Sequence, residues 1–387
     1  MTKMLILLSF LFSLPLTLVA DNSSEIQRPP PVIITPHSMS LNAASWILMD
    51  YETGDIVSSK NINLKHQPAS LSKIMTSYII AHELEQGSLR LDQKIPISDK
   101  AAKTPGSKMF IAANTYVTVK DLLDGLIIQS GNDAAVALAE FIAGSDTNFV
   151  KLMNKTALAL GMKNTNFATV DGLPGDNQYT TAYDIAILSR AFIAHYPAIY
   201  KIYSQLKFKY GDITQKNRNK LLTSYNGADG IKTGFTSKAG YNLAASAIRN
   251  GQRYISVILG APSSKVRENE SIKLLNFAFS KFTDFKLYEH GSVISLENTK
   301  IPNAKQGSHL AIMSDETLIK TIPRTFVKHL TKTVILNKGL KAPIDKGHNV
   351  GHLVFSAGEH TIASIPIKAN NNIDQSGILS RIMSYFK

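Results

Sequence analysis

The chain has 387 residues, no cysteine and a formal net charge of +13. Its length allows two ordinary domains, and 44% hydrophobic with 18% charged residues is typical of a globular protein rather than a disordered one. The lack of cysteine excludes structural disulfides, thiol nucleophiles and cysteine-ligated metals. The ten histidines form no pair with metal-hydrolase spacing, so we expect neither a metal nor a cofactor.

The N-terminal residues 1–20 resemble a secretory signal peptide. An apolar run follows Lys3, and cleavage is expected after Ala20. A membrane span is the alternative, but Pro15 interrupts a run that is already short for a bilayer. Residues 21–40 are expected to form a polar leader, so the sequence predicts an exported protein. Its Lys and Arg are dispersed, which argues against nucleic acid and favours anionic lipid headgroups or an acidic cell-wall polymer as partners.

Residues 41–283 have the pattern of one α+β domain. Predicted strands come first, helices follow, and further strands and a long helix close the segment, which favours helices packed on an antiparallel sheet. The expected elements are a hairpin over 46–57, helices over 70–86, 119–129, 132–142, 146–161 and 181–196, a strand at Lys232, a hairpin over 241–259 and a helix over 264–282.

The remainder of the chain differs in character. Over residues 284–370, short β-branched runs alternate with Gly, Pro and Asn, which is typical of a small all-β domain. Residues 371–387 are expected to end in an amphipathic helix with Arg381 and Lys387 on its polar face. We expect this helix to hold the protein peripherally on a membrane surface, and the alternative is that it packs on the β domain.

Three short strings occur in a meaningful order: Ser70-Leu71-Ser72-Lys73, Ser130-Gly131-Asn132 and Lys232-Thr233-Gly234. Ser-x-x-Lys and Ser-x-Asn recur elsewhere in the chain, so neither is specific alone, whereas Lys-Thr-Gly is unique. The first string falls at a predicted helix start, the second in a loop between helices and the third in a strand. Together they indicate an enzyme that acylates a serine with penicillin-like or D-alanyl-peptide substrates.

The residue types suit acyl transfer. A serine hydroxyl is a weak nucleophile, and Lys73, one turn after Ser70, can take its proton if burial or neighbouring charge lowers the lysine pKa. Ser130 can relay a proton to the leaving nitrogen. Asn132 can hold the lysine and the substrate amide, or it can cap the following helix. The strand around Lys232 can pair with an extended peptide substrate.

The motifs, the predicted domains and the tail resemble the low-molecular-mass penicillin-binding proteins, serine-type D-alanyl-D-alanine carboxypeptidases of the penicillin-binding protein 5 class. The resemblance implies an α+β domain of the serine β-lactamase/DD-peptidase kind, followed by a small all-β domain and a C-terminal amphipathic helix. It also implies removal of the terminal D-alanine from peptidoglycan stem peptides, acylation by β-lactam antibiotics, and a place at the periplasmic face of the cytoplasmic membrane.

The resemblance further implies residue roles. Ser70 is expected to be the nucleophile, Lys73 the general base and Ser130 the proton relay. The residues expected to bind substrate are Asn132, Lys232, Thr233, Gly234, Thr236 and Arg253, and the backbone amides of Ser70 and Phe235 are expected to form the oxyanion hole. Thr236 and Arg253 match positions that bind the terminal carboxylate of the substrate. Phe235 departs from relatives, which often carry His, and this bears on substrate preference and deacylation rate.

Three alternatives stay open. A serine β-lactamase shares the fold and the nucleophile, but a class A enzyme needs a Glu to activate the deacylating water. The only Glu between Gly131 and Gly230 is Glu140, inside a predicted helix. A DD-endopeptidase differs in substrate size and usually lacks the C-terminal domain. A non-enzymatic cell-wall binding protein would not be labelled on Ser70 by penicillin.

Overall fold

The computed structural model describes residues 16–20 and 39–377. The chain divides into two compact units, which we call the larger unit (Pro36–Ser280) and the smaller unit (Met1–Thr35 with Lys281–Lys387). The division at Ser280 comes three residues before the domain boundary that we expected after residue 283. Each unit has a hydrophobic core of its own.

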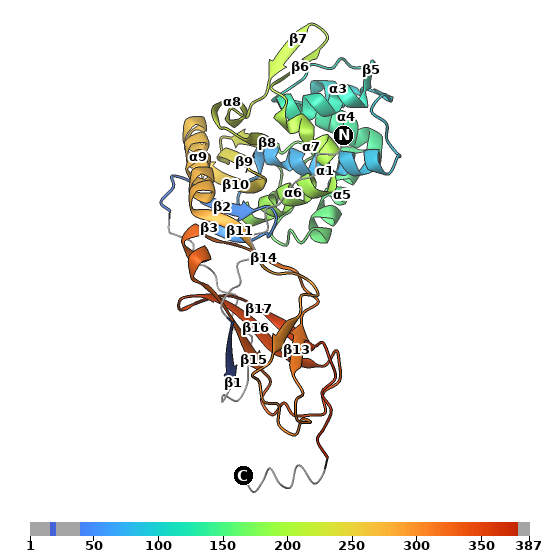
Figure 1. The fold of residues 1–387 in the computed structure, drawn as a ribbon. Helices are drawn as coiled ribbons and strands as arrows, with labels where there is room; N and C mark the ends of the chain where they lie inside the picture. The colour runs from blue at the N-terminus through green and yellow to red at the C-terminus, as the bar shows by residue number, and fades with distance from the viewer. Residues whose placement is uncertain (1–15, 21–38, 378–387) are drawn as a thin grey trace, which may run out of the picture. The chain divides into compact units, whose positions relative to one another are not determined.

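An antiparallel five-stranded sheet runs through the larger unit in the order β3-β2-β10-β9-β8. Its strands are β2 (Ser45–Asp50), β3 (Ile56–Lys60), β8 (Ala228–Thr236), β9 (Gly240–Arg249) and β10 (Gln252–Ala261). Every residue of β2 is buried, because helices cover both faces of the sheet. Figure 1 shows α9 (Ser264–Lys281) on one face and α1 (Ser72–Glu85) and α6 (Ala182–His195) on the other.

The helical part of the larger unit lies between β3 and β8 in the sequence. It consists of η1 (Ala69–Leu71), α1, α2 (Asp99–Lys103), α3 (Val119–Asp124), η2 (Gly125–Gln129), α4 (Asn132–Ala143), α5 (Asp146–Ala159), α6, α7 (Pro197–Tyr200), η3 (Lys201–Ser204) and α8 (Leu221–Ser224). Two short hairpins accompany these helices, β4 (Lys94–Pro96) with β5 (Tyr116–Thr118) and β6 (Lys207–Tyr210) with β7 (Ile213–Lys216). Two helices that we expected to be continuous are broken, at η1 and at the π-helical turn η2. Both breaks fall beside a sequence motif.

The smaller unit is all-β over most of its described length. One sheet has the order β1-β15-β16-β17-β13-β12, and a separate pair joins β11 to β14. The elements are β1 (Leu16–Ala20), β11 (Phe282–Tyr288), β12 (Ile294–Leu296), β13 (Leu310–Met313), β14 (Leu318–Pro323), η4 (Arg324–His329), β15 (Leu330–Leu336), β16 (Asn349–Ala357) and β17 (His360–Ala369). Alternate residues of β16 and β17, such as Leu353, Phe355 and Ile365, form its core.

The predicted signal peptide and the predicted C-terminal helix lie partly or mostly outside the described residues. The last five residues of the expected signal peptide form β1, which pairs in parallel with β15, and residues 1–15 lie outside the described part. The apolar face of the expected C-terminal helix falls on residues 378–387, which also lie outside it. Within residues 16–20 and 39–377, no helix is long and apolar enough to cross a bilayer.

Candidate active site

Ser70 lies in the short 3₁₀ helix η1, directly before α1. The preceding residue, Ala69, has a φ of +50°, in the left-handed region that residues with a Cβ seldom adopt. Strained backbone of this kind is concentrated at functional sites. The turn therefore places Ser70 at a strained step between the preceding chain and α1.

Two glycines let other backbone segments reach this turn. A Cβ at Gly172, whose φ is +82°, would lie 1.8 Å from the carbonyl oxygen of Ala69. A Cβ at Gly234 would lie 3.2 Å from the amide nitrogen of Ser70. The loop at Gly172 and strand β8 at Gly234 thus both contact the nucleophile turn. This contact places the backbone of Phe235, the next residue of β8, beside the Ser70 amide.

Lys73 is fully buried and reaches three oxygen acceptors. Its Nζ lies 3.1 Å from Ser70 Oγ, 2.6 Å from Asn132 Oδ1 and within hydrogen-bond distance of the carbonyl oxygen of Asp171. Burial lowers the pKa of Lys73 to about 8; the Asp171 charge opposes this shift, and the Arg218 charge adds to it. The ammonium therefore loses its proton far more readily than an exposed lysine.

The second motif follows the π-helical turn η2 and opens α4. Ser130 is buried and has a φ of +69°, which ends the turn and brings its side chain toward the interior. Asn132 is also buried: its Nδ2 donates to the carbonyl oxygen of Pro105 at 2.7 Å, while its Oδ1 accepts from Lys73. The side chain of Asn132 therefore holds the lysine and does not cap its own helix.

The residue after this motif, Asp133, orders the loop that covers the site. Its carboxylate accepts from the backbone amides of Met109 at 3.0 Å and Phe110 at 2.9 Å. The amide of Asn132 in turn donates to the carbonyl oxygen of Ser107 at 2.7 Å. These bonds fix the loop at residues 105–111 against the start of α4.

Lys232 of β8 is buried among cations. Burial lowers its pKa well below the usual value, and the charges of Lys73, Arg218 and Arg267 lower it further. Its Nζ donates to the carbonyl oxygen of Thr233 at 3.3 Å. A substrate carboxylate would supply the negative charge that favours the protonated form.

Phe235 and Thr236 form the end of β8. The Phe235 side chain is 52% exposed, and its ring centroid lies 4.3 Å from that of Tyr241, its partner across the strands. The Thr236 hydroxyl accepts from the amide of Ala239 at 3.0 Å, which leaves its own hydrogen available to a ligand.

The structure contradicts the expected position of Arg253. This residue lies near the start of β10, eight residues before Ala261, which is level with Phe235 through the β9 register. Eight strand residues span roughly 26 Å, so Arg253 lies far from the end of β8. Its Nη1 instead donates to Asp229 Oδ1 at 2.9 Å and to Ser246 Oγ at 2.6 Å, so the guanidinium is already paired.

Another arginine, which the sequence reasoning missed, occupies the expected place. Arg267 of α9 is buried, and its Nη1 donates to the carbonyl oxygens of Gly234 at 3.1 Å and Asn242 at 3.2 Å. A signal for it was present, because helical spacing puts Arg267 on the same buried face of α9 as Ser271 and Leu274. A buried arginine directly behind the Lys-Thr-Gly strand is a strong candidate for binding an anion.

Three further features of the larger unit concern Glu140, possible metal ligands and a separate hollow. Glu140 lies on the third turn of α4 and accepts a hydrogen bond from Ser98 Oγ at 2.6 Å. It does not lie beside Ser70. In the described part of the chain, no three His, Cys, Asp or Glu side chains gather as metal ligands.

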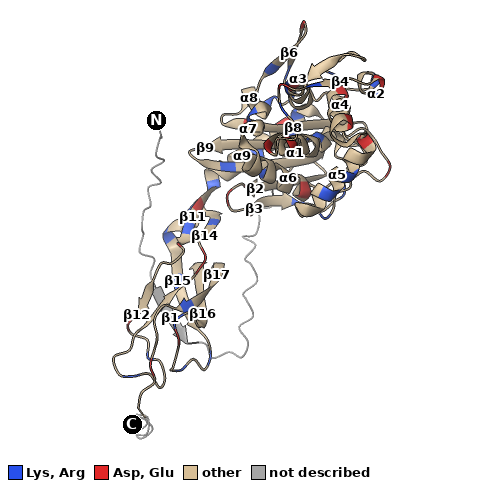
Figure 2. Ribbon diagram, turned by 90° about the vertical axis from the view of Figure 1, so that its right-hand side faces the viewer, with Lys and Arg blue, Asp and Glu red and all other residues tan. Residues whose placement is uncertain are grey.

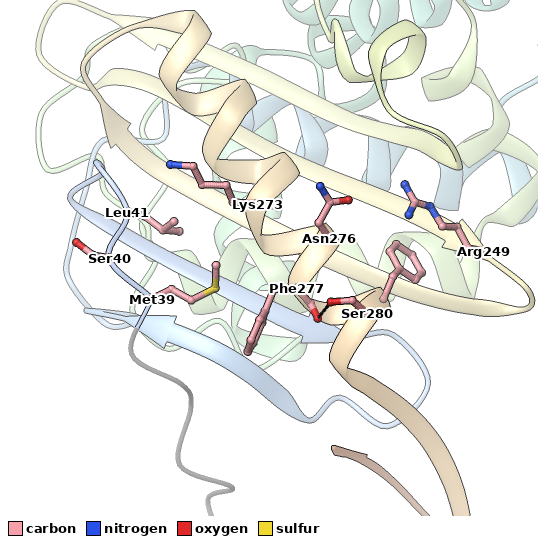
Figure 3. A pocket seen from close by; sticks show the side chains of 9 residues that line it. Met39, Ser40, Leu41, Arg249, Lys273, Asn276, Phe277 and Ser280 are labelled. Atoms are coloured by element: carbon pink, nitrogen blue, oxygen red, sulfur yellow. Dashed lines mark hydrogen bonds between the residues drawn. The ribbon is translucent and has the colours of Figure 1, made fainter. Parts of the chain in front are cut away.

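A separate hollow of about 700 Å³ lies between Met39–Leu41 and α9, where Figure 3 shows Lys273 and Asn276 projecting from the helix. None of the motif residues lines this hollow.

Comparisons with known proteins agree with this geometry. A family model of D-alanyl-D-alanine carboxypeptidases matches residues 32–263, and a model of the penicillin-binding protein 5 C-terminal domain matches residues 282–375. The D-alanyl-D-alanine carboxypeptidase DacA of Haemophilus influenzae is 39% identical over 99% of this chain and 96% of its own length.

Solved structures give the same result. The D-alanyl-D-alanine carboxypeptidase DacD from Francisella tularensis has a TM-score of 0.84 and 42% identity, over 89% of this chain and 97% of that chain. Penicillin-binding protein D2 from Listeria monocytogenes, in its cefotaxime-bound form, has a TM-score of 0.58 and 30% identity, over 62% of this chain and 98% of that chain. These matches confirm the expected fold of an α+β domain followed by an all-β domain. The chain belongs to the D-alanyl-D-alanine carboxypeptidase family and carries a penicillin-binding protein 5 C-terminal domain.

Proposed function

We propose that this chain is a serine carboxypeptidase that removes the terminal D-alanine from peptidoglycan pentapeptide stems through an acyl-enzyme on Ser70. The contact of 3.1 Å between Lys73 Nζ and Ser70 Oγ carries the proposal. A buried lysine with a pKa of about 8 is partly neutral at ordinary pH and can accept the serine proton. Membership of the family supplies the substrate class.

Acylation begins with neutral Lys73. Its two N–H groups donate to Asn132 Oδ1 and to the carbonyl oxygen of Asp171, which leaves the nitrogen lone pair for the hydroxyl of Ser70. As the proton moves to Nζ, Ser70 Oγ attacks the carbonyl carbon of the penultimate D-alanine. The amides of Ser70 and Phe235 stabilise the oxyanion that forms, and one such donor is worth roughly 2.7–4 kcal/mol in comparable enzymes.

The tetrahedral intermediate then collapses. Ser130 gives its proton to the leaving nitrogen, the C–N bond breaks and D-alanine departs, while the Lys73 ammonium restores the Ser130 proton. The acyl ester on Ser70 remains. Water attacks this ester while Lys73 accepts its proton. The C–O bond to Ser70 then breaks as Lys73 returns that proton to Ser70 Oγ, and the shortened peptide leaves with a new carboxylate. A β-lactam would enter by the same first step.

Four side chains at β8 and α9 are proposed to receive the terminal carboxylate of the substrate. Lys232 supplies positive charge in the interior, and the hydroxyls of Thr233 and Thr236 have hydrogens to donate. Arg267 takes the role expected of Arg253, because it is the arginine that contacts the Lys-Thr-Gly strand. A carboxylate here would give the cations a counter-charge.

The proposed place of action is the periplasmic face of the cytoplasmic membrane. Residues 1–20 support export, and residues 371–387 support peripheral attachment through an amphipathic helix. Both proposals rest on the sequence pattern of the chain ends.

The proposed function is tested by incubating the purified protein with a muropeptide pentapeptide and measuring released D-alanine. Release by the wild type and none by Ser70→Ala is the expected result, and penicillin should label Ser70 in a mass map. Faster turnover of penicillin than of the peptide would identify a β-lactamase instead. Cleavage of cross-linked dimers without D-alanine release would identify an endopeptidase. A protein that shows neither turnover nor penicillin labelling would be a non-enzymatic binding protein.

A further inference from the structure

The hairpin of β6 and β7 carries a row of lysines on one face. Figure 1 shows the hairpin projecting from the larger unit. Phe208 and Tyr210 alternate with Lys207 and Lys209 along β6, and Phe208 is buried against the helical core while both lysines are exposed. Lys216 of β7 is exposed and directly opposite Lys207. We call Lys207, Lys209 and Lys216 the lysine face.

The charge on this face is not neutralised within the protein. Lys207 and Lys216 form a like-charged pair across the strands, an arrangement that destabilises a hairpin. Among the described residues, no salt bridge joins any of the three lysines to a carboxylate. Residues 201–220 contain six basic residues and one acidic residue, Asp212. Figure 2 shows the basic residues on the β6 arm.

The hairpin is attached to the walls of the candidate active site. Gln215 Nε2 donates to the carbonyl oxygen of Lys108 at 3.0 Å, in the loop whose Ser107 bonds Asn132. Arg218, two residues after β7, donates from Nε to the carbonyl oxygen of Gln129 at 3.0 Å, directly before Ser130. A polymer bound on the hairpin would therefore lie close to segments that form the candidate active site.

We propose that the lysine face binds the carboxylates of polymeric peptidoglycan, so that the enzyme favours glycan strands with several stem peptides over short peptides. The inference rests on the proposed function and names the form of substrate that this site prefers. Each stem peptide presents free carboxylates, and repeated stems make the polymer polyanionic. An array of unneutralised ammonium groups beside the site raises the local concentration of such a chain, an effect that weakens as salt screens the charges.

A membrane surface fits the lysine face less well. Interfacial binding combines basic residues with apolar side chains that enter the lipid beside them. On this hairpin the large side chains Phe208, Tyr210 and Ile213 lie on the opposite face, and the fourth residue of the lysine face is Thr214. The lysine face itself presents no apolar side chain, which suits a hydrated polyanion.

The test compares two substrates in three proteins. The substrates are soluble glycan strands bearing pentapeptide stems and a short D-Ala-D-Ala peptide whose other ionisable groups are blocked. The proteins are the wild type, the triple variant Lys207→Gln/Lys209→Gln/Lys216→Gln, and a matched control, Lys151→Gln/Lys155→Gln/Lys163→Gln, which removes the same charge from exposed positions at α5. Penicillin acylation rates measure whether Ser70 and Lys73 remain intact.

We expect the hairpin variant to lose roughly tenfold or more in kcat/KM on glycan strands and less than about twofold on the short peptide, with penicillin acylation unchanged. The control should keep wild-type values, and added salt should reduce the wild-type advantage on glycan strands. Co-sedimentation with purified sacculi should show the same loss without any need for turnover.

Equal losses on both substrates would overturn the proposal and assign the hairpin a supporting role for the site. If the control variant lost as much kcat/KM on glycan strands as the hairpin variant, the effect would be due to net charge and not to the lysine face. If the hairpin variant turned over glycan strands normally but no longer bound anionic phospholipid vesicles, the lysine face would be a membrane-binding surface instead. A wild type that releases D-alanine from neither substrate contradicts the proposed function, and sacculus binding then tests the lysine face separately.

Discussion

At the scale of single residues, the candidate site is a balance of burial and charge around Lys73. Burial favours its neutral amine, Asp171 opposes that effect, and Arg218 reinforces it. The neutral form is the one that can accept a proton from Ser70. The pH at which the enzyme works is therefore adjustable through residues that are not part of the motifs.

The first prediction concerns this adjustment. Acylation by penicillin should rise about tenfold per pH unit below about 8 and level off above it, because only deprotonated Lys73 is a base. Asp171→Asn should move the midpoint to lower pH, since it removes the charge that raises the Lys73 pKa. Arg218→Gln should move it to higher pH. Stopped-flow acylation rates from pH 6 to 10 would measure both shifts, and shifts of the same sign would contradict the assignment.

The second prediction separates the two arginines. Arg267→Gln should weaken a free-acid D-Ala-D-Ala peptide by roughly 1.5–3 kcal/mol in kcat/KM, the usual range for a charged hydrogen bond. A peptide with an amidated C-terminus should change little, because it lacks the anionic partner. Arg253→Gln should instead lower the melting temperature, since it removes the ion-pair partner of Asp229, and should affect both peptides alike. A selective loss in the Arg253 variant alone would restore the role expected from the sequence.

At the scale of elements, the site depends on where backbone segments contact one another. The nucleophile turn η1, the loop at Gly172 and strand β8 at Gly234 lie in direct contact, and any Cβ between them would separate the catalytic groups. The hairpin of β6 and β7 adds a charged arm to this rigid centre.

Gly172→Ala is predicted to disable the site. The new Cβ would overlap the carbonyl oxygen of Ala69 at 1.8 Å, so the nucleophile turn must move. Gly144→Ala is the matched control, because Gly144 has a similar φ of +73° but nothing within 4 Å of the added Cβ. Both variants should lose about 1 kcal/mol of stability from backbone strain. Only Gly172→Ala should lower the acylation rate, by at least tenfold, and equal rates in the two variants would show that the contact is unimportant.

The lysine face offers a prediction of the opposite sign for stability. Lys216→Glu converts the like-charged pair with Lys207 into an opposite-charged pair. Thermal unfolding should show a gain of roughly 0.2–1 kcal/mol at low salt, reduced at high salt. The same variant should bind sacculi more weakly than the wild type. If the variant became more stable and also bound sacculi more tightly, the proposed role of the lysine face would be contradicted.

At the scale of the whole molecule, the two units have separate cores, and the described active-site residues all belong to the larger unit. The smaller unit contributes β strands and, at its end, the tail that the sequence predicts to be amphipathic. The candidate active site and the proposed membrane attachment thus belong to different parts of the chain.

Deleting residues 376–387 should release active enzyme into the soluble periplasmic fraction. Each apolar side chain of the tail that enters the lipid would contribute up to about 1.5–3 kcal/mol, and Arg381 and Lys387 would contribute roughly 1 kcal/mol each at an anionic surface. Turnover of short peptides in solution should not change, because the tail lies outside the larger unit. Fractionation and peptide kinetics would check both points. A truncated protein that still sediments with membranes or unfolds would place the tail in the β domain instead.

The sequence by itself was enough for the family, the fold class and the main order of elements, and it supplied most residues of the candidate site as predictions. Ser70, Lys73, Ser130, Asn132 and Lys232 were recognisable because acyl transfer needs those side chains at fixed spacings along a helix, a loop and a strand. The hairpins of β2 with β3 and of β9 with β10 were predictable because turn residues mark them, whereas the hairpins of β4 with β5 and of β6 with β7 were not predicted.

Only the tertiary structure decided which groups meet across the fold. Strand register carries Arg253 away from the site, whereas helix packing brings Arg267 to Gly234. The backbone carbonyl of Asp171 and the contact at Gly172 leave no sequence signal, because they depend on a loop distant in the chain. Side-chain types and local spacing are written in the sequence, whereas burial, and with it the lowered pKa of Lys73, exists only once the chain has folded.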